Sequence, residues 1–211
     1  MRVLLLSPYP QTIEMPILEG GDHVITSNAS PSEIDFSADF IICFGYRHII
    51  QEQILRTVVR PIINLHISYL PWNKGADPNF WSWFEHTPKG VSVHEVDIGI
   101  DTGPLLVQTE VTFSESEQET LTTSYNKLCS TVSELFSKTW PLIRANEIKP
   151  TPQFGKGSCH RSKDKDLWWK LLSNGYDSPV GEIENIGSEV TASGLFWDKY
   201  DQEIGELKSS L

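Results

Sequence analysis

The chain has 211 residues, of which 39% are hydrophobic and 21% charged, and its formal net charge is −11. These values are typical of one globular domain with an appendage, and the negative charge argues against a large surface for nucleic acid. No apolar run approaches the length of a membrane span, and the three cysteines lack the spacing of a disulfide framework or a zinc site. We therefore expect a cytoplasmic protein that binds no metal, no membrane and no nucleic acid.

The first third of the chain alternates short apolar segments with turn residues. Strands are predicted at residues 2–7, 23–26 and 40–44, and the third is the strongest because it contains β-branched and aromatic residues and is bounded by Gly45. Helices are predicted at residues 11–19 and 51–59. The turn after the first strand lacks the glycine-rich fingerprint of a dinucleotide site, so we do not expect NAD binding.

Residues 61–71 contain the side chains on which the functional prediction depends. Apolar residues there alternate with polar ones, which is the periodicity of a strand. Period two places Asn64 and His66 on the same side of this strand, so both can face one small target. Alternatively, both side chains are buried and satisfied by backbone partners, and only the residues further along the chain favour a functional role.

A loop, a short helix and another strand come next. Asp77 is expected to cap a helix that has Pro78 in its first turn and runs to about residue 86. Residues 91–96 predict a strand, and the turn after it carries the carboxylate of Asp101. A carboxamide, an imidazole and a carboxylate therefore lie near the ends of neighbouring predicted strands, where open α/β sheets bind their ligands.

Three segments carry a specific pattern: Asn64-Leu65-His66-Ile67-Ser68-Tyr69-Leu70-Pro71, Gly90-Val91-Ser92-Val93-His94 and Asp101-Thr102-Gly103-Pro104. With Gly75 and Pro78 between them, they resemble the folate-dependent formyltransferase family. This family includes glycinamide ribonucleotide formyltransferase, the catalytic domain of methionyl-tRNA formyltransferase and the sugar N-formyltransferases. The resemblance implies a catalytic Asn64, His66 and Asp101, and 10-formyltetrahydrofolate as the formyl donor. We expect a Rossmann-like α/β fold: an open, mostly parallel sheet with flanking helices and an antiparallel edge strand.

The resemblance also implies binding residues. In the family, the loop after the third strand lines the pterin pocket, and here it contains Tyr46, Arg47, His48, Ile49 and Ile50. Without the resemblance, this loop would be an ordinary strand-to-helix turn. The donor site is expected to include a second group from the later turn, namely Asp97, Ile98 and Gly99. On the acceptor side, the expected residues are Lys74, Gly75, Asp77, Pro78 and Trp81.

These residue types suit the transfer of a formyl group to an amine. Asn64 and a protonated His66 can donate to the oxygen that becomes negative in the tetrahedral intermediate. Asp101 would favour the charged form of His66, order water or relay a proton, and either His66 or Asp101 can be the immediate base. Ser68 lacks the context of a nucleophile and is expected to hydrogen-bond the turn, while His94 is expected to be structural.

The second half of the chain predicts an edge strand at residues 105–111, a capping box at residues 114–117 and an amphipathic helix that ends before Pro141. Pro150-Thr151-Pro152 marks a boundary, so we predict a catalytic domain at 1–149 and a C-terminal extension at 150–211. The extension has a basic loop, a short helix from about residue 166 and a tail with Leu195-Phe196-Trp197 as its apolar anchor. The basic loop is either solvated or faces an anionic substrate, and the tail packs on the domain or contacts a second copy in a homodimer.

We expect the acceptor to be a small amine, phosphorylated or nucleotide-linked. The segment from Asn73 to Trp81 resembles bacterial sugar N-formyltransferases that modify nucleotide-linked amino sugars, which places such a sugar ahead of glycinamide ribonucleotide. A methionyl-tRNA enzyme would need a basic surface and an additional C-terminal domain, for which this acidic chain is too short. Two other classes remain: a metal-dependent hydrolase that uses His66, Asp101 and His94 or His160, and a non-catalytic binding module with the same fold.

Overall fold

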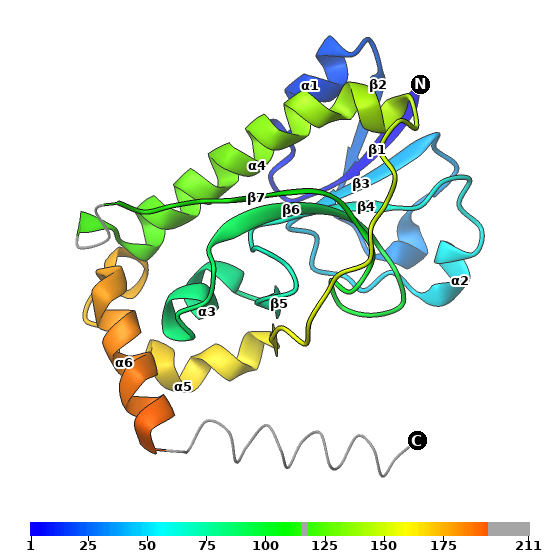
Figure 1. Cartoon of the computed structure of the whole chain (residues 1–211). Coiled ribbons are helices and arrows are strands. Elements are labelled where there is room, and N and C mark those ends of the chain that lie inside the picture. Colours follow the sequence, from blue (N-terminus) through cyan, green and yellow to red (C-terminus); the bar gives the residue numbers. More distant parts are fainter. Residues whose placement is uncertain (115–117, 194–211) are drawn as a thin grey trace.

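The computed structural model describes residues 1–114 and 118–193, arranged around one six-stranded sheet (Figure 1). The strand order is β2-β1-β3-β4-β6-β7. The strands are β1 (Arg2–Leu6), β2 (His23–Ser27), β3 (Phe40–Phe44), β4 (Ile63–His66), β6 (Gly90–Glu95) and β7 (Leu105–Glu110). The pairs among β2, β1, β3 and β4 are parallel, whereas β6 pairs antiparallel with β4 and with the edge strand β7. The predicted α/β fold with an antiparallel edge strand is therefore confirmed.

One face of the sheet is covered by helices α1 (Glu14–Glu19) and α4 (Leu121–Arg144) (Figure 1). Helix α4 is amphipathic, and its buried residues recur every three or four positions: Leu121, Ser124, Leu128, Val132, Phe136, Trp140 and Ile143. The five from Leu128 to Ile143 pack on alternate residues of the strands, such as Ile63 and Leu65 of β4. Because side chains alternate along a strand, the intervening residues of β4 face the opposite side.

The opposite face is covered by the short helix α2 (Glu52–Leu55) and by the loops that follow β3 and β6. Its apolar part consists of Leu4, Leu6, Ile41, Cys43, Ile50 and Ile62, with Tyr46, Ile54, Val58 and Val96 packed against them. Asn64 pairs with Cys43 in the register of β3 and β4, so Asn64 lies on this face of the sheet. The candidate catalytic residues are therefore on the side away from α4.

A third hydrophobic cluster joins helix α3 (Pro78–Phe84) to the C-terminal extension. Four aromatic residues of α3 pack against residues of helix α6 (Val180–Ser193), including Val180 and Ile183. A two-stranded parallel sheet makes a second connection, between β5 (Lys74–Gly75) and β8 (Cys159–His160). The helix α5 (Asp166–Trp169) lies between these two contacts in the chain, preceded by a 3-10 turn at Ser162–Lys165 and followed by another at Gly175–Asp177. The division at residue 150 stays a prediction.

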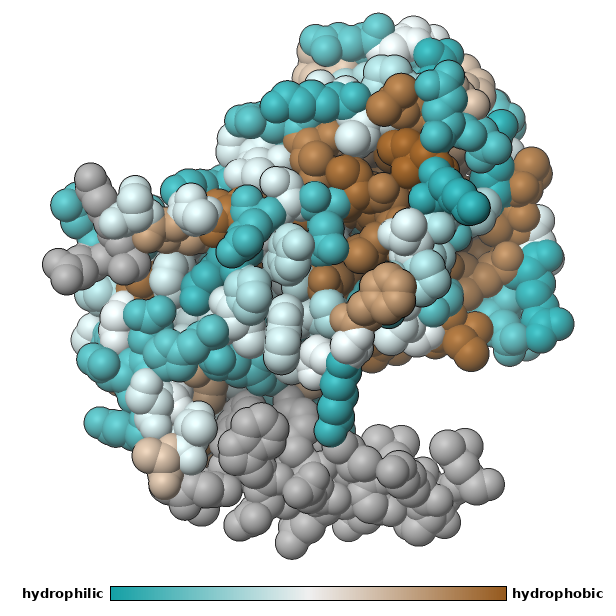
Figure 2. All heavy atoms as spheres, viewed as in Figure 1, coloured by the Kyte–Doolittle hydropathy of each residue, from teal (hydrophilic) through white to brown (hydrophobic). Residues whose placement is uncertain are grey.

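Hydrophobic atoms gather at the surface between α4 and the segment that follows it (Figure 2). A cavity of about 120 Å³ lies there, lined by apolar residues of β3, β4 and β7 together with Ile143 and Ile148. Within residues 1–114 and 118–193, no helix is long and apolar enough to cross a membrane.

The structure corrects three sequence predictions. Helix α4 continues through Pro141 to Arg144, because Pro141 is exposed and the buried Trp140 and Ile143 hold the last turn against the sheet. The helix predicted at residues 51–59 is only the four-residue α2. Helix α6 is missing from the prediction, although it buries residues at helical spacing. The proposed capping box at 114–117 falls largely on residues outside the described part, as do residues 195–197.

Glycine explains why α6 escapes prediction. Gly181 and Gly187 both lower the intrinsic helix propensity of this segment. However, a Cβ atom at Gly187 would lie 1.9 Å from the carbonyl oxygen of Phe84, so glycine is what allows α6 to approach α3 closely. The packing of α6 on α3 therefore outweighs its weak propensity.

Candidate active site

The three predicted catalytic residues lie together in one group of polar side chains. Asn64 comes from β4 and Asp101 from the turn after β6, and the Asn64 Nδ2 donates to Asp101 Oδ1 at 3.0 Å. Asp101 Oδ2 lies 3.6 Å from His66 Nδ1. All three residues are largely shielded from solvent, with 9% and 13% of the His66 and Asp101 side chains exposed. The sequence positions 64, 66 and 101 thus converge as the strand pattern predicts.

The orientation of His66 is set by a backbone carbonyl. Its Nε2 lies 3.0 Å from the carbonyl oxygen of Asn73, and a carbonyl can only accept a hydrogen bond. Nε2 must therefore carry a proton and donate it to Asn73. Nδ1, which faces Asp101, is the ring nitrogen that can gain or lose a proton.

Asp101 is held as a carboxylate by its surroundings. Burial alone would raise the pKa of Asp101, but the positive charge of His66, contacts with His94 and the Gly75 N–H together hold this pKa well below its ordinary value. The Gly75 N–H donates to Asp101 Oδ2 at 2.8 Å. Asp101 itself has a left-handed backbone with φ 50.

A side chain from the C-terminal extension holds the Asp101 turn. Gln153 Nε2 donates to the carbonyl oxygens of Asp101 and Gly103, each at 2.8 Å. A Cβ atom at Gly103 would also lie 1.9 Å from the carbonyl oxygen of Glu95, so the turn folds back tightly on β6. The backbone of the Asp101 turn is thus held from two directions, by β6 and by the extension.

Strand β5 brings a backbone N–H to the site because of its pairing with β8. The Ala76 N–H donates to the carbonyl oxygen of His160 at 2.9 Å, and Gly75 lies opposite His160 in the register. Gly75 has φ +82, and a Cβ atom there would lie 2.2 Å from the same carbonyl oxygen. Only glycine fits this close approach without displacing the backbone.

His94 and Gln153 also contact this group, although the sequence does not predict a catalytic role for either. His94 is predicted to be structural, but its Nε2 lies 3.2 Å from Asn64 Nδ2 and 3.4 Å from Asp101 Oδ1. The Nδ1 of His94 donates to the carbonyl oxygen of Glu95 at 2.7 Å, which leaves Nε2 facing the site. The antiparallel register that sets Asn64 opposite His94 would identify it, but this register is not visible in the sequence alone. Ser68 does hydrogen-bond its turn, donating to the carbonyl oxygen of Trp72 at 2.8 Å.

The residues predicted to bind the donor lie on two loops beside the site face. Tyr46 is half-buried and its hydroxyl donates to the carbonyl oxygen of Ala29, and Ile50 is buried in the apolar cluster of that face. The three residues between them are exposed: Arg47, His48 and Ile49. On the second loop, Asp97 Oδ1 accepts from the Gly99 N–H at 3.0 Å and shapes the turn, whereas Ile98 is exposed.

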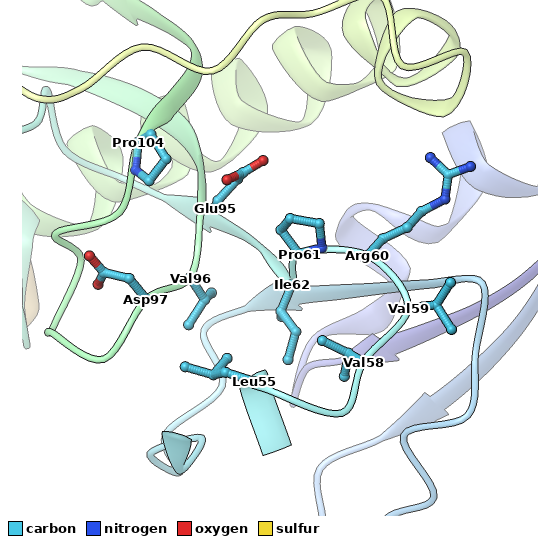
Figure 3. Close-up of a pocket in the computed structure, with 10 residues that line it drawn as sticks. All are labelled: Leu55, Val58, Val59, Arg60, Pro61, Ile62, Glu95, Val96, Asp97 and Pro104. Atoms are coloured by element: carbon cyan, nitrogen blue, oxygen red, sulfur yellow. The ribbon is translucent and has the colours of Figure 1, made fainter. Parts of the chain in front are cut away.

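A cavity of about 320 Å³ opens on this side of the sheet (Figure 3). It is lined by Leu55, Val58, Val59, Arg60, Pro61, Ile62, Glu95, Val96, Asp97 and Pro104. Of the residues predicted to bind the donor, it includes Asp97, and it does not include the three predicted catalytic side chains. The cavity is therefore next to the second predicted donor loop, the one with Asp97, rather than at the reacting centre.

The residues predicted on the acceptor side have different environments. Burial lowers the pKa of Lys74, whose Nζ lies 3.4 Å from the carbonyl oxygen of Lys156. Asp77 occupies the cap position of α3, with Pro78 at its first residue, but Asp77 makes no side-chain cap bond. Its carboxylate instead pairs with Lys165 at 2.6 Å, so the predicted capping role is wrong.

Trp81 and part of the basic loop lie in the interior. Trp81 is 1% exposed, and its ring stacks on that of His160 with 3.9 Å between centroids. Trp81 is thus placed beneath the site rather than on its surface. His160 and Lys165 are also buried, whereas Lys156, Arg161 and Lys163 remain exposed. In the described ranges, no group of three or more His, Cys, Asp or Glu residues is arranged to hold a metal ion.

Comparison with known proteins gives consistent matches. The formyl transferase family model matches residues 27–139, which include Asn64, His66 and Asp101. A methionyl-tRNA formyltransferase from Thermodesulfovibrio yellowstonii is 35% identical over 120 residues, covering 56% of this chain and 38% of that protein. A second such enzyme, from Clostridium tetani, is 34% identical, covering 65% of this chain and 45% of that protein. This chain thus spans less than half the length of these curated relatives.

A solved structure matches over more of its length. The formyltransferase PseJ from Anoxybacillus kamchatkensis, in complex with UDP-4,6-dideoxy-4-formamido-L-AltNAc and tetrahydrofolate, is 42% identical with a TM-score of 0.83. The match covers 89% of this chain and 100% of that one. A sugar N-formyltransferase from Shewanella has a TM-score of 0.72 but only 18% identity, so it supports the fold alone.

Proposed function

This chain belongs to the formyl transferase family, and we propose that it transfers the formyl group of 10-formyltetrahydrofolate to the amine of a nucleotide-linked amino sugar. The observation that carries the proposal is the convergence of three side chains on the face of the sheet away from α4: Asn64 donates to Asp101 at 3.0 Å, and His66 lies 3.6 Å from the same carboxylate. A carboxamide, an imidazole and a carboxylate together supply a hydrogen-bond donor, a titrating group and a fixed negative charge. These are the functions that acyl transfer between two nitrogens requires.

In the proposed reaction, the acceptor nitrogen forms a bond to the formyl carbon, and the bond from that carbon to the folate nitrogen breaks. The attacking nitrogen loses one proton, and the departing nitrogen gains one. Negative charge develops on the formyl oxygen in between, so donors must be aimed at the position of that oxygen. No covalent bond to the enzyme is required, because holding the two reactants together removes much of the entropic barrier.

His66 and Asn64 are the proposed donors to this oxygen. The His66 Nδ1 and the Asn64 amide face the same carboxylate, so both point into one small volume. The two hydrogens of Asn64 Nδ2 face Asp101 and His94. If His94 Nε2 gained a proton, it could no longer accept from Asn64 and would donate toward Asp101 instead. The Asn64 hydrogen that had faced His94 would then be available to the substrate. Asp101 stays ionised, since its pKa is held low, and it stabilises positive charge on His66.

The proposed donor site uses Tyr46, Arg47, His48, Ile49 and Ile50 with Asp97, Ile98 and Gly99. Support comes from the apolar cluster of the site face, which contains Ile50 and has Tyr46 and Val96 packed against it. Apolar walls with a few polar groups are typical of sites for flat ring systems. The cavity lined by Val96 and Asp97 lies at the second of the two donor loops, which contains Asp97, Ile98 and Gly99.

The proposed acceptor site uses Lys74, Gly75, Asp77, Pro78 and Trp81. Lys74 and Gly75 adjoin Asp101, and the exposed cations Lys156 and Arg161 come before and after β8, the strand that pairs with Lys74 and Gly75. Cations at this position suit an acceptor with a diphosphate. Trp81 would act by supporting His160 from below, given its burial. The similarity to PseJ, whose structure holds a UDP-sugar, favours a nucleotide-linked amino sugar over glycinamide ribonucleotide.

Methionyl-tRNA is the second candidate acceptor, because the curated relatives named above formylate it according to their names. The net charge of −11 opposes a phosphate-rich partner of that size. The decisive experiment supplies 10-formyltetrahydrofolate with UDP- and dTDP-linked 4-amino and 3-amino sugars, glycinamide ribonucleotide and methionyl-tRNA in parallel. We expect the product of a nucleotide-linked amino sugar to gain the mass of one formyl group. Formylation of methionyl-tRNA alone, or of no amine at all, would overturn the proposal.

A further inference from the structure

We propose that Glu85 and Asn73 are positioning residues that fix which nitrogen of His66 exchanges a proton. This inference rests on the proposed function, because it assigns His66 a role in formyl transfer. Neither residue lies on a predicted strand or among the predicted binding residues. Both are connected to His66 by a chain of short polar contacts that begins at the carbonyl oxygen of Asn73.

Asn73 is held in place on every side. It is fully buried, and its backbone is left-handed with φ 55, a conformation that asparagine tolerates better than most residues. Its Nδ2 donates to Glu85 Oε2 at 2.9 Å, and its Oδ1 accepts from the Thr87 hydroxyl at 2.8 Å. Its backbone N–H donates to Ser158 Oγ at 3.0 Å. The direction of the Asn73 carbonyl is therefore determined by these partners.

Glu85 is the centre of this network. It follows the last residue of α3, and 11% of its side chain is exposed. Besides Asn73, Oε2 accepts from Ser158 Oγ at 2.6 Å, while Oε1 lies 3.0 Å from His160 Nε2. A carboxylate this far from water requires such partners, because an unpaired buried charge is very costly. Glu85 thereby ties Asn73 to the strand that also holds Gly75 at Asp101.

The consequence for His66 concerns its tautomer. In the observed arrangement, Nε2–H donates to Asn73 and Nδ1 faces Asp101. If the Asn73 carbonyl turned away, the proton of neutral His66 could move to Nδ1 and leave Nε2 without a partner. Nδ1 would still face the carboxylate but would carry the proton, so it could no longer accept one. A purely structural network, by contrast, would change the stability of the loop and leave the tautomer of folded His66 unchanged.

The test uses four variants of the whole chain. Glu85→Ala removes the carboxylate that accepts hydrogen bonds from Asn73 and Ser158. Glu85→Gln keeps one oxygen for these two residues and adds an amide N–H group that can donate to neutral His160. Asn73→Gly removes the side chain but accepts a positive φ. Asn79→Ala is the matched control, since Asn79 is also a buried asparagine, bonded to the Leu121 carbonyl and the Ser124 hydroxyl, away from His66.

Nitrogen-15 NMR of labelled histidine reports which ring nitrogen is protonated, and the six histidines of the chain give a spectrum that variants can assign. We expect His66 to be protonated at Nε2 in the wild type, in Glu85→Gln and in Asn79→Ala. Both tautomers should be populated in Glu85→Ala and Asn73→Gly. Turnover should fall roughly 10- to 100-fold in the latter two variants, as small displacements of reacting groups do, and should remain largely intact in Glu85→Gln.

An unchanged His66 tautomer in folded Asn73→Gly would overturn the inference, as would an equal loss of turnover in Asn79→Ala. If Glu85→Ala does not fold, Asn73→Gly carries the same comparison. If the wild type formylates no amine, the proposed function fails on its own, while the NMR measurement still decides whether the network sets the tautomer.

Discussion

The two faces of the sheet differ in what covers them and in what they bury. One face lies under the 24-residue helix α4, and the other lies under the four-residue helix α2 and long loops. Strand β4 contributes to both faces. Its Ile63 and Leu65 join the apolar core under α4, while Asn64 and His66 point to the opposite side. There Asn64 bonds to Asp101 in a distant turn, and His66 bonds to Asn73 in the loop that follows β4.

This difference separates stability from chemistry within one strand. On the α4 face, burial of apolar area is the main contribution, and its partners are provided by regular helical spacing. On the site face, each buried polar group needs a specific partner, because an unpaired one costs about 1–3 kcal/mol. Those partners come from loops, which can place Asp101, Asn73 and Gln153 individually.

The largest effect is expected from the site face. Replacing Asn64, His66 or Asp101 by alanine removes the proposed oxyanion donor, the proposed titrating group or its counter-charge, so turnover should fall roughly 10²- to 10⁴-fold. The α4 face is untouched, so folding and folate binding should be largely retained. Steady-state formylation, folate titration and thermal melting measure these quantities. Near-normal turnover of His66→Ala with the true acceptor would contradict the mechanism.

On the α4 face, Phe136→Ala should lower the stability of the protein rather than its turnover. Phe136 is fully buried against Trp140 and the sheet, and removal of its ring should lower the free energy of unfolding by about 3–5 kcal/mol. The fraction that remains folded should keep its turnover per molecule. Urea denaturation gives the stability, and Leu142→Ala, at an exposed position of the same helix, is the control with little expected change.

Gly75→Ala is expected to have a smaller effect on both turnover and stability. The new Cβ would meet the His160 carbonyl at 2.2 Å, so β5 must move and carry the Gly75 N–H away from Asp101. We expect turnover to fall roughly 10- to 100-fold. Gly21→Ala shares a positive φ but meets nothing within 4 Å, so it measures backbone strain alone, about 1–3 kcal/mol, without loss of turnover. Equal effects of the two variants on turnover would show that the approach to His160 is unimportant.

The smallest effect concerns the pH dependence of stability. Because the folded-state pKa of Asp101 is depressed, its ionised form contributes stability above the unfolded pKa of about 3.9, and this contribution is lost as the pH falls through the lower folded value. The difference in unfolding free energy between the wild type and Asp101→Asn should therefore shrink as the pH is lowered from 7 toward 3. Urea titrations at a series of pH values measure it. A difference that does not change with pH would mean that the charge of Asp101 adds nothing.

Regular periodicity made much of the fold predictable. The alternation in residues 61–68 and the three-to-four spacing in α4 identify these elements, and the ordered motif identifies Asn64, His66 and Asp101. Such patterns are local, and each follows from the burial of one face of one element. Helix α6 was not predicted, because its Gly187 serves a tertiary contact with α3 that no local pattern shows.

The rest of the site depends on contacts between distant segments. His94 reaches Asn64 through antiparallel pairing, and Gln153 reaches Asp101 from a segment that the sequence assigns to the extension. Asp77 has the sequence context of a helix cap, but its carboxylate pairs with Lys165 instead. In each case a side chain found a partner 30 or more positions away in the chain, whereas sequence rules consider nearby partners.

The pairing of β5 with β8 restricts how this enzyme can be recombined with its relatives. A chimera joined at the proline-rich stretch near residue 150 would replace Gln153, Ser158 and His160 together, and with them the supports of Asp101, Asn73 and Gly75. A splice placed after Lys165 would keep those supports and exchange only the chain from α5 onward. Designers who want a new acceptor on this catalytic core should therefore choose the later junction.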